Sequence, residues 1–163
     1  MTGAMLLPEF DQEMDNTRKV LERIPAGSMD FRPHARSWTL RELAGHVANI
    51  PEWAHVTLAT TELDFAEPFP RPRLDTPADL LALFDRERAT SRAAMEKATG
   101  DDLGVPWTLR AGKQVYFTMP RGAVLRTFVM NHLIHHRAQL TVYLRLLDVP
   151  VPGMYGPSAD EAQ

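Results

Sequence analysis

Apolar side chains recur every three or four positions over a long run of the sequence, from about residue 121 to 147. At roughly 100° per residue, such a run forms a helix with one continuous stripe facing the core. Two histidines, one helical turn apart, occupy positions in this stripe where Leu or Val is usual. The stripe consists of Leu125, Val129, His132, His136, Gln139, Tyr143 and Leu147. His135 lies about 100° from His136 and therefore at the edge of the stripe.

Two buried imidazoles one turn apart need partners for their ring nitrogens, because burying an unsatisfied polar group costs free energy. His132 and His136 can satisfy this need by sharing one metal ion. They can equally be ordinary core histidines that are hydrogen-bonded to backbone groups or to water. A third ligand elsewhere in the chain would decide between these two interpretations.

A second helix supplies a candidate for that third ligand. It is expected to begin at Thr39, whose side chain can form a capping box with Glu42 three residues later. The core-facing stripe of this helix contains His46, whereas His55 lies about 180° around the helix and is expected to be exposed. Pro51 removes one backbone hydrogen bond, so we expect a kink there and a continuation of the helix to about residue 60.

The remaining chain is expected to alternate between helices and connections. The expected segments are a helix at residues 7–24, a proline-rich crossover at 64–75, a helix at 76–99, a short hairpin or ordered loop at 101–120, and an extended, partly disordered tail at 149–163. In the first helix, Glu13 belongs to the expected solvated face. Thr76 followed by Pro77 is typical of a helix start, with threonine as the N-cap and proline in the first turn.

Chain length indicates the number of domains, and composition excludes several classes of function. A chain of 163 residues is expected to form a single domain, residues 1–163. The net charge is −3 and the sequence shows no basic stripe, which argues against a nucleic-acid partner. No apolar run approaches the ~20 residues needed to span a bilayer, so no membrane partner is expected. The absence of cysteine excludes disulfides, thiolate ligands and a cysteine nucleophile, and it fits a cytoplasmic protein.

Three core-facing histidines thus emerge from the sequence: His46, His132 and His136. If their helices are neighbours, three neutral imidazoles can converge on one divalent cation. Imidazole nitrogen suits zinc, nickel, iron or cobalt rather than magnesium or calcium. Three protein ligands leave a position open for water or substrate, which is typical of a catalytic site. An ion in such a site can lower the pKa of bound water to about 7 or hold a thiol as thiolate.

Two patches of the sequence resemble the DinB-like superfamily of four-helix-bundle proteins. One patch is the stretch Trp-Thr-Leu-Arg-Glu-Leu-Ala-Gly-His that ends at His46, and the other is Asn-His-x-x-His-His-Arg-Ala-Gln at residues 131–139. The second is close to the family's recurring His-x-x-x-His-Arg-x-Gln, with Ala138 where the family often has glycine. The resemblance covers most of the chain.

The resemblance implies an all-α fold, a four-helix bundle of up-down-down-up type with a long connection between helices two and three. It also implies one divalent metal, usually zinc or nickel, bound at His46, His132 and His136. Homodimers are common in the family. Its characterised branches include S-transferases that use a low-molecular-weight thiol (bacillithiol, mycothiol or glutathione) and maleylpyruvate isomerases.

Roles for the neighbouring side chains stay open at this point. Gln139 and Asn49 could orient an imidazole or a metal-bound water, or could simply be satisfied by the backbone. Arg137 could anchor an anionic cofactor or form a surface salt bridge. Glu52 is a candidate general base whose direction the sequence does not define. Trp53 is expected to pack rather than to contact substrate.

Three functions compete on this basis. The first is a metal-dependent transferase or hydrolase that acts on a small-molecule substrate. The second is a metal-binding module or sensor without turnover that uses the same three histidines. The third is an interaction protein of the same fold with satisfied core histidines and no metal. No catalytic residue beyond the metal ligands is assigned.

Overall fold

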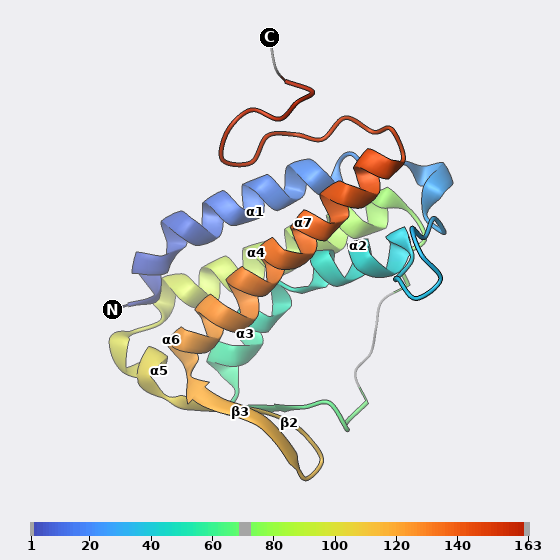
Figure 1. The fold of residues 1–163 in the computed structure, drawn as a ribbon. Coiled ribbons are helices and arrows are strands. Elements are labelled where there is room, and N and C mark those ends of the chain that lie inside the picture. Colours follow the sequence, from blue (N-terminus) through green and yellow to red (C-terminus); the bar gives the residue numbers. More distant parts are fainter. Residues whose placement is uncertain (1, 69–72, 162–163) are drawn as a thin grey trace.

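The computed structural model describes residues 2–68 and 73–161, and most of them lie in helices (Figure 1). Helices α1 (Leu7–Leu21), α4 (Pro77–Lys97) and α7 (Asn131–Leu146) lie beside a broken helix formed by α2 (Leu40–Asn49) and α3 (Glu52–Ala59). Helices α1 and α7 run in one direction, and α2, α3 and α4 run in the other (Figure 1). The shorter helical segments are η1 (Gly3–Leu6) before α1, η2 (Ala26–Ser28) and α5 (Gly100–Gly104) in connections, and α6 (Arg121–Val124) and η3 (Leu125–Met130), which lead directly into α7. Within the described residues, no helix is long and apolar enough to cross a membrane.

The expectation of a strictly all-α fold is wrong, because the chain also forms a small sheet. Strands β1 (Glu62–Asp64), β2 (Pro106–Ala111) and β3 (Gln114–Pro120) pair in the order β1-β2-β3. The last two form the hairpin expected between residues 101 and 120, and β1 adds to β2 in parallel. Trp107 and Leu109 alternate inward along β2 and are buried with Val124, so the sheet has its own apolar cluster.

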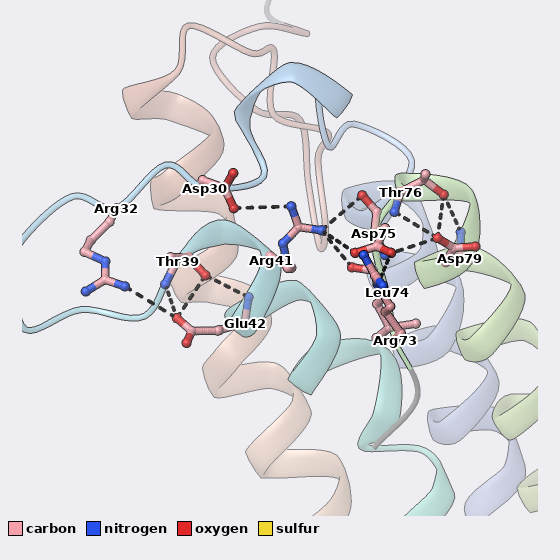
Figure 2. Close-up of polar contacts among 10 residues, drawn as sticks. All are labelled: Asp30, Arg32, Thr39, Arg41, Glu42, Arg73, Leu74, Asp75, Thr76 and Asp79. Atoms are coloured by element: carbon pink, nitrogen blue, oxygen red, sulfur yellow. Dashed lines mark hydrogen bonds and ion pairs between the residues drawn. The ribbon is translucent and has the colours of Figure 1, made fainter. Parts of the chain in front are cut away.

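Local sequence signals explain where the helices begin and break. Both expected helix starts are confirmed, because Thr39 with Glu42, and Thr76 with Asp79, form reciprocal capping boxes (Figure 2). The expected break at Pro51 is also confirmed, since α2 ends at Asn49 and α3 begins at Glu52.

Arg41 fastens the beginning of α2 to neighbouring segments. Its guanidinium donates to the carboxylate of Asp30 at 3.2 Å and to the carbonyl of Leu74 at 3.0 Å, just before α4 begins (Figure 2). The start of the helix that carries His46 is therefore held by hydrogen bonds on both sides. Pro70 and Pro72 of the expected crossover lie outside the described residues.

A π-helical turn, η3, sits inside the last helix and changes which residues face the core. A π turn accommodates one more residue than an α turn, so every later position is rotated relative to the expected stripe. The buried positions after the turn are Leu133, Arg137, Leu140, Tyr143 and Leu144. The predicted stripe is therefore displaced by about one residue. His132 and His136 are only half-buried, and Gln139 is exposed.

Arg137 is buried, which makes both sequence-based interpretations of this residue wrong. Its Nη2 lies 2.7 Å from Oε2 of Glu13 on α1, and the two side chains are 3% and 6% exposed. The hydroxyl of Tyr155 accepts from Arg137 at 2.7 Å and donates to the Glu13 carboxylate at 2.9 Å. Glu13 therefore does not belong to a solvated face. The described tail residues fold back over the helices to bring Tyr155 to this pair (Figure 1).

The buried pair gives a first prediction. Arg137→Met should lower the free energy of unfolding by about 3–5 kcal/mol, because it leaves the Glu13 carboxylate buried without its cation. The double variant Arg137→Met with Glu13→Leu should be closer to the wild type, since both charges are removed. Chemical denaturation measures all three proteins.

Arg126→Met provides the matched control, because Arg126 pairs with Glu9 at the surface, where the side chains are 45% and 37% exposed. It should cost about 1 kcal/mol or less. A loss that small in Arg137→Met would contradict the structural role assigned to the buried pair.

Candidate metal centre

Three histidine rings from two helices meet on one side of α7. His46 comes from α2, and His132 and His136 come from successive turns of α7. The ring centroids form a triangle with sides of 5.0, 4.6 and 4.6 Å. One nitrogen from each ring lies within 4.8 Å of the other two. The structure thus brings together the three histidines that the sequence singled out.

The spacing of the donor atoms suits a single transition-metal ion. Nε2 of His46 lies 3.2 Å from Nε2 of His132. Two imidazole nitrogens bound tetrahedrally at about 2.0–2.1 Å would be about 3.3 Å apart. A set of three imidazoles without a carboxylate is a donor set for zinc or a neighbouring late transition metal. The residues present therefore fit the ion that the family resemblance implies.

Gln139 fixes the protonation of one ring. Its Oε1 accepts a hydrogen bond from Nδ1 of His136 at 2.7 Å, so the proton of the neutral ring sits on Nδ1 and Nε2 keeps its lone pair. Of the two open interpretations of Gln139, the structure supports the one in which this residue orients an imidazole. It does so from an exposed position rather than from the core.

The environment keeps two of the rings neutral. The pKa of His132 is lowered from 6.5 to about 4. Burial is the main cause, and the positive charge that His136 carries when it is protonated is a smaller one. The carbonyl of Phe128 opposes this shift, although Nδ1 of His132 is buried without a hydrogen bond of regular geometry. Burial also lowers the pKa of His136, against the hydrogen bond from Gln139. Neutral imidazoles are the form that binds metal.

Two tryptophans flank the histidines. Trp38 stacks on His136 with a ring separation of 5.8 Å and meets His46 edge-on at 5.2 Å. Trp53 contacts the rings of His46 at 5.9 Å and His132 at 5.3 Å, and it stacks on Phe128 at 4.5 Å. The expectation that Trp53 packs is confirmed, and its packing partners include the histidines themselves. The contact of Trp38 with His136 joins residues far apart in sequence, so no local signal indicated it.

A pocket of about 430 Å³ reaches His136 from the surface. This volume lies within the usual range of small-molecule sites. Its lining residues are Arg36, Ser37, Trp38, Leu43, His136, Gln139, Val142 and Tyr143. One member of the triad, His136, is therefore accessible to a small molecule on the side of Trp38.

A second group of metal-ligand residue types lies between α3 and α4 and consists of Glu52, His55 and Glu87. Each of its members has a protein partner. Asn49 donates to Glu52 at 2.9 Å, Nδ1 of His55 lies 3.1 Å from Oγ of Ser91, and Arg86 donates to Glu87 at 2.8 Å. These contacts account for the cluster without an ion, so the histidine triad is the better candidate metal centre.

This second group corrects the expectation for His55 and shows where Asn49 and Glu52, whose roles were open, make their contacts. His55 is half-buried against α4 rather than exposed. Asn49 binds Glu52 and not an imidazole. Glu52 belongs to this group and does not line the pocket beside His136. The spacing Glu-x-x-His at residues 52–55 places both side chains on one helix face and is the local signal for the group.

Comparisons with known proteins agree with the fold. The sequence model of the DinB family matches residues 1–163. The protein YrdA of Bacillus subtilis (strain 168) is 30% identical over 161 residues, which cover 95% of this chain and 89% of YrdA. A crystal structure of a DinB-like protein from Bacillus cereus ATCC 10987 superposes with a TM-score of 0.71 at 23% identity, covering 92% of this chain and 95% of that one. The DinB-like protein YjoA of Bacillus subtilis superposes with a TM-score of 0.69 at 19% identity, covering 90% and 95%.

The lowered pKa of His132 predicts acid sensitivity of the metal-free protein. Between its folded pKa of about 4 and the ordinary value of 6.5, the unfolded chain binds more protons than the folded one. The free energy of unfolding should therefore fall as the pH is lowered through this window, by on the order of 1 kcal/mol between about pH 7 and pH 5.5. Denaturation in the presence of a chelator measures this change.

His132→Leu should remove most of that pH dependence, whereas His34→Gln, which changes an exposed loop histidine, should keep it. An identical pH dependence in the wild type and in His132→Leu would show that this ring is not the group that titrates.

Proposed function

The chain belongs to the DinB family, and from this membership together with the geometry of the histidine triad we propose that it is a metal-dependent enzyme. His46, His132 and His136 hold one divalent ion, zinc or nickel, between the helices of a four-helix bundle. The observation that carries the proposal is the convergence of three imidazoles within 4.8 Å, one of which, His136, also lines a pocket. The proposal includes a single domain over residues 1–163, a homodimer, and a small-molecule substrate.

The surroundings of the triad limit the proton-transfer groups that are available to the reaction. A bound ion of this type lowers the pKa of a thiol or water and so supplies a nucleophile near neutral pH. Hydrolysis generally also calls for a general base beside the attacking water. Among the described residues, those lining the pocket include no carboxylate, and Glu52 is hydrogen-bonded to Asn49. The ion itself can form a bound thiolate or a bound hydroxide without such a base, so the proposal covers an S-transferase and a hydrolase.

The protein's own side chains prepare the site for this chemistry. Gln139 holds the proton of His136 on Nδ1, leaving Nε2 to face an ion. Trp38 and Trp53 pack against rings of the triad on two sides. In this proposal, substrate reaches the site through the pocket beside His136.

Metal content tests the proposal. Purified protein without a metal-binding tag, reconstituted with zinc or nickel, should hold about one equivalent by plasma mass spectrometry. His46→Ala and His132→Ala should each lose it, because two imidazoles bind far more weakly than three. Glu87→Gln is the matched control and should keep the ion, since Glu87 belongs to the second group.

Two results would contradict this assignment. Loss of the ion in Glu87→Gln with retention in both histidine variants would move the site to the group between α3 and α4. No binding of either metal by the wild type would leave a protein that acts through interactions alone.

A milder change tests the role of Gln139. Gln139→Leu should lower the affinity for zinc by roughly 10–100-fold, because the ring of His136 loses the acceptor that fixes its tautomer. Competition with a chromophoric chelator measures the affinity. Gln139→Glu keeps an acceptor and should retain tight binding. Equal affinities for wild type and Gln139→Leu would show that Gln139 does not act on the metal centre.

A further inference from the structure

The pocket that reaches His136 has an unbalanced charge. Among the described residues that line it, Arg36 is the one permanent cation, and no lining residue is a carboxylate. The protein as a whole carries a net charge of −3, so this lining differs from the average surface. A guanidinium at the mouth of an otherwise neutral pocket attracts anions.

Arg36 differs from the neighbouring arginines in lacking an acidic partner. Arg41 is bound to Asp30, and Arg32 lies 3.9 Å from the carboxylate of Glu42 (Figure 2). In the part of the chain that the structure describes, the Arg36 guanidinium forms no ion pair. Its backbone is nevertheless held, because the amide of Arg36 donates to Nδ1 of His34 at 3.1 Å. The loop backbone at Arg36 is thus held in place, and its guanidinium, which lines the pocket, forms no ion pair among the described residues.

The other polar groups of the pocket add hydrogen-bond donors. Oε1 of Gln139 is occupied by His136, so this side chain offers its amide NH₂. Ser37 adds a hydroxyl that can donate. The hydroxyl of Tyr143 already donates to the carbonyl of Trp38 at 3.0 Å. A cation followed in sequence by a hydroxyl donor, Ser37, matches a carboxylate and disfavours an amine, whereas the Gln139 amide lies at the His136 end of the pocket.

Apolar surface completes the pocket. Trp38 and Val142 are 47% and 57% exposed, and Leu43 lies in the pocket wall. These side chains suit the apolar body of a small ligand, because covering them removes apolar surface from water. We propose that the pocket binds a small carboxylate with an apolar body, with its carboxylate paired to Arg36 and its other end toward His136. This inference rests on the proposed function only in taking His136 as part of the metal centre.

Binding of phenylacetate to the full chain tests the inference, with phenylacetamide as the neutral analogue of nearly the same shape. Titration calorimetry at low salt gives the affinities, and the indole N–H resonance of Trp38 reports occupancy of this pocket. The wild type should bind phenylacetate more tightly than phenylacetamide. Arg36→Gln should weaken phenylacetate binding by about tenfold, as expected for a charge-assisted hydrogen bond. It should leave phenylacetamide unchanged.

Arg32→Gln is the matched control, since Arg32 faces Glu42 and does not line the pocket. It should bind phenylacetate as the wild type does. Equal affinity of the wild type for the two compounds, no binding of either, or equal weakening in Arg32→Gln and Arg36→Gln would each overturn the inference.

The titrations are run on both metal-free and zinc-reconstituted protein, so that this inference and the proposed function can fail separately. Arg36-dependent binding of phenylacetate to protein that takes up no zinc would uphold the pocket and reject the metal enzyme. Zinc uptake without any preference for phenylacetate would uphold the metal centre and reject the carboxylate-binding pocket.

Discussion

The π-helical turn at residues 125–130 decides which side chains of the last helix enter the core and which face the metal centre. In an uninterrupted α-helix, the positions of His132 and His136 would continue the buried stripe of Leu125 and Val129. Because the π turn holds an extra residue, Leu133, Leu140 and Leu144 are buried in the core instead. His132 and His136 then lie at the edge of the core. Their partial burial keeps the rings neutral and leaves part of each ring exposed.

Both helices that carry the histidines are fixed by polar contacts away from the site. The buried pair of Arg137 and Glu13 joins α7 to α1. The hydroxyl of Tyr155, in the C-terminal tail, is hydrogen-bonded to both residues. Arg41 holds the start of α2 between two neighbouring segments. Such contacts hold the ligand-bearing backbones, while in the site itself Nδ1 of His132 is buried without a hydrogen bond of regular geometry. A cost of this kind is typical of functional sites, where local stability is sacrificed.

Features encoded within one turn of helix could be predicted from the sequence. The capping boxes at Thr39 and Thr76, the break at Pro51, and the pairing of His132 with His136 all depend on residues four or fewer positions apart. Features that depend on distant contacts could not. The parallel pairing of Glu62 with Thr108, the burial of Arg137 and the stacking of Trp38 on His136 have no local pattern. The π turn could not be predicted either, because a prediction from apolar periodicity assumes one helical pitch throughout.

The central claim is that three imidazoles form the metal centre, and X-ray absorption of the zinc-reconstituted protein tests it most directly. The account predicts a first shell of three imidazole nitrogens at about 2.0–2.1 Å, with the fourth position taken by a light, non-imidazole ligand. The multiple scattering of imidazole rings identifies these ligands. A first shell dominated by carboxylate oxygens, with a single imidazole, would instead place the ion at Glu52, His55 and Glu87 and contradict the account.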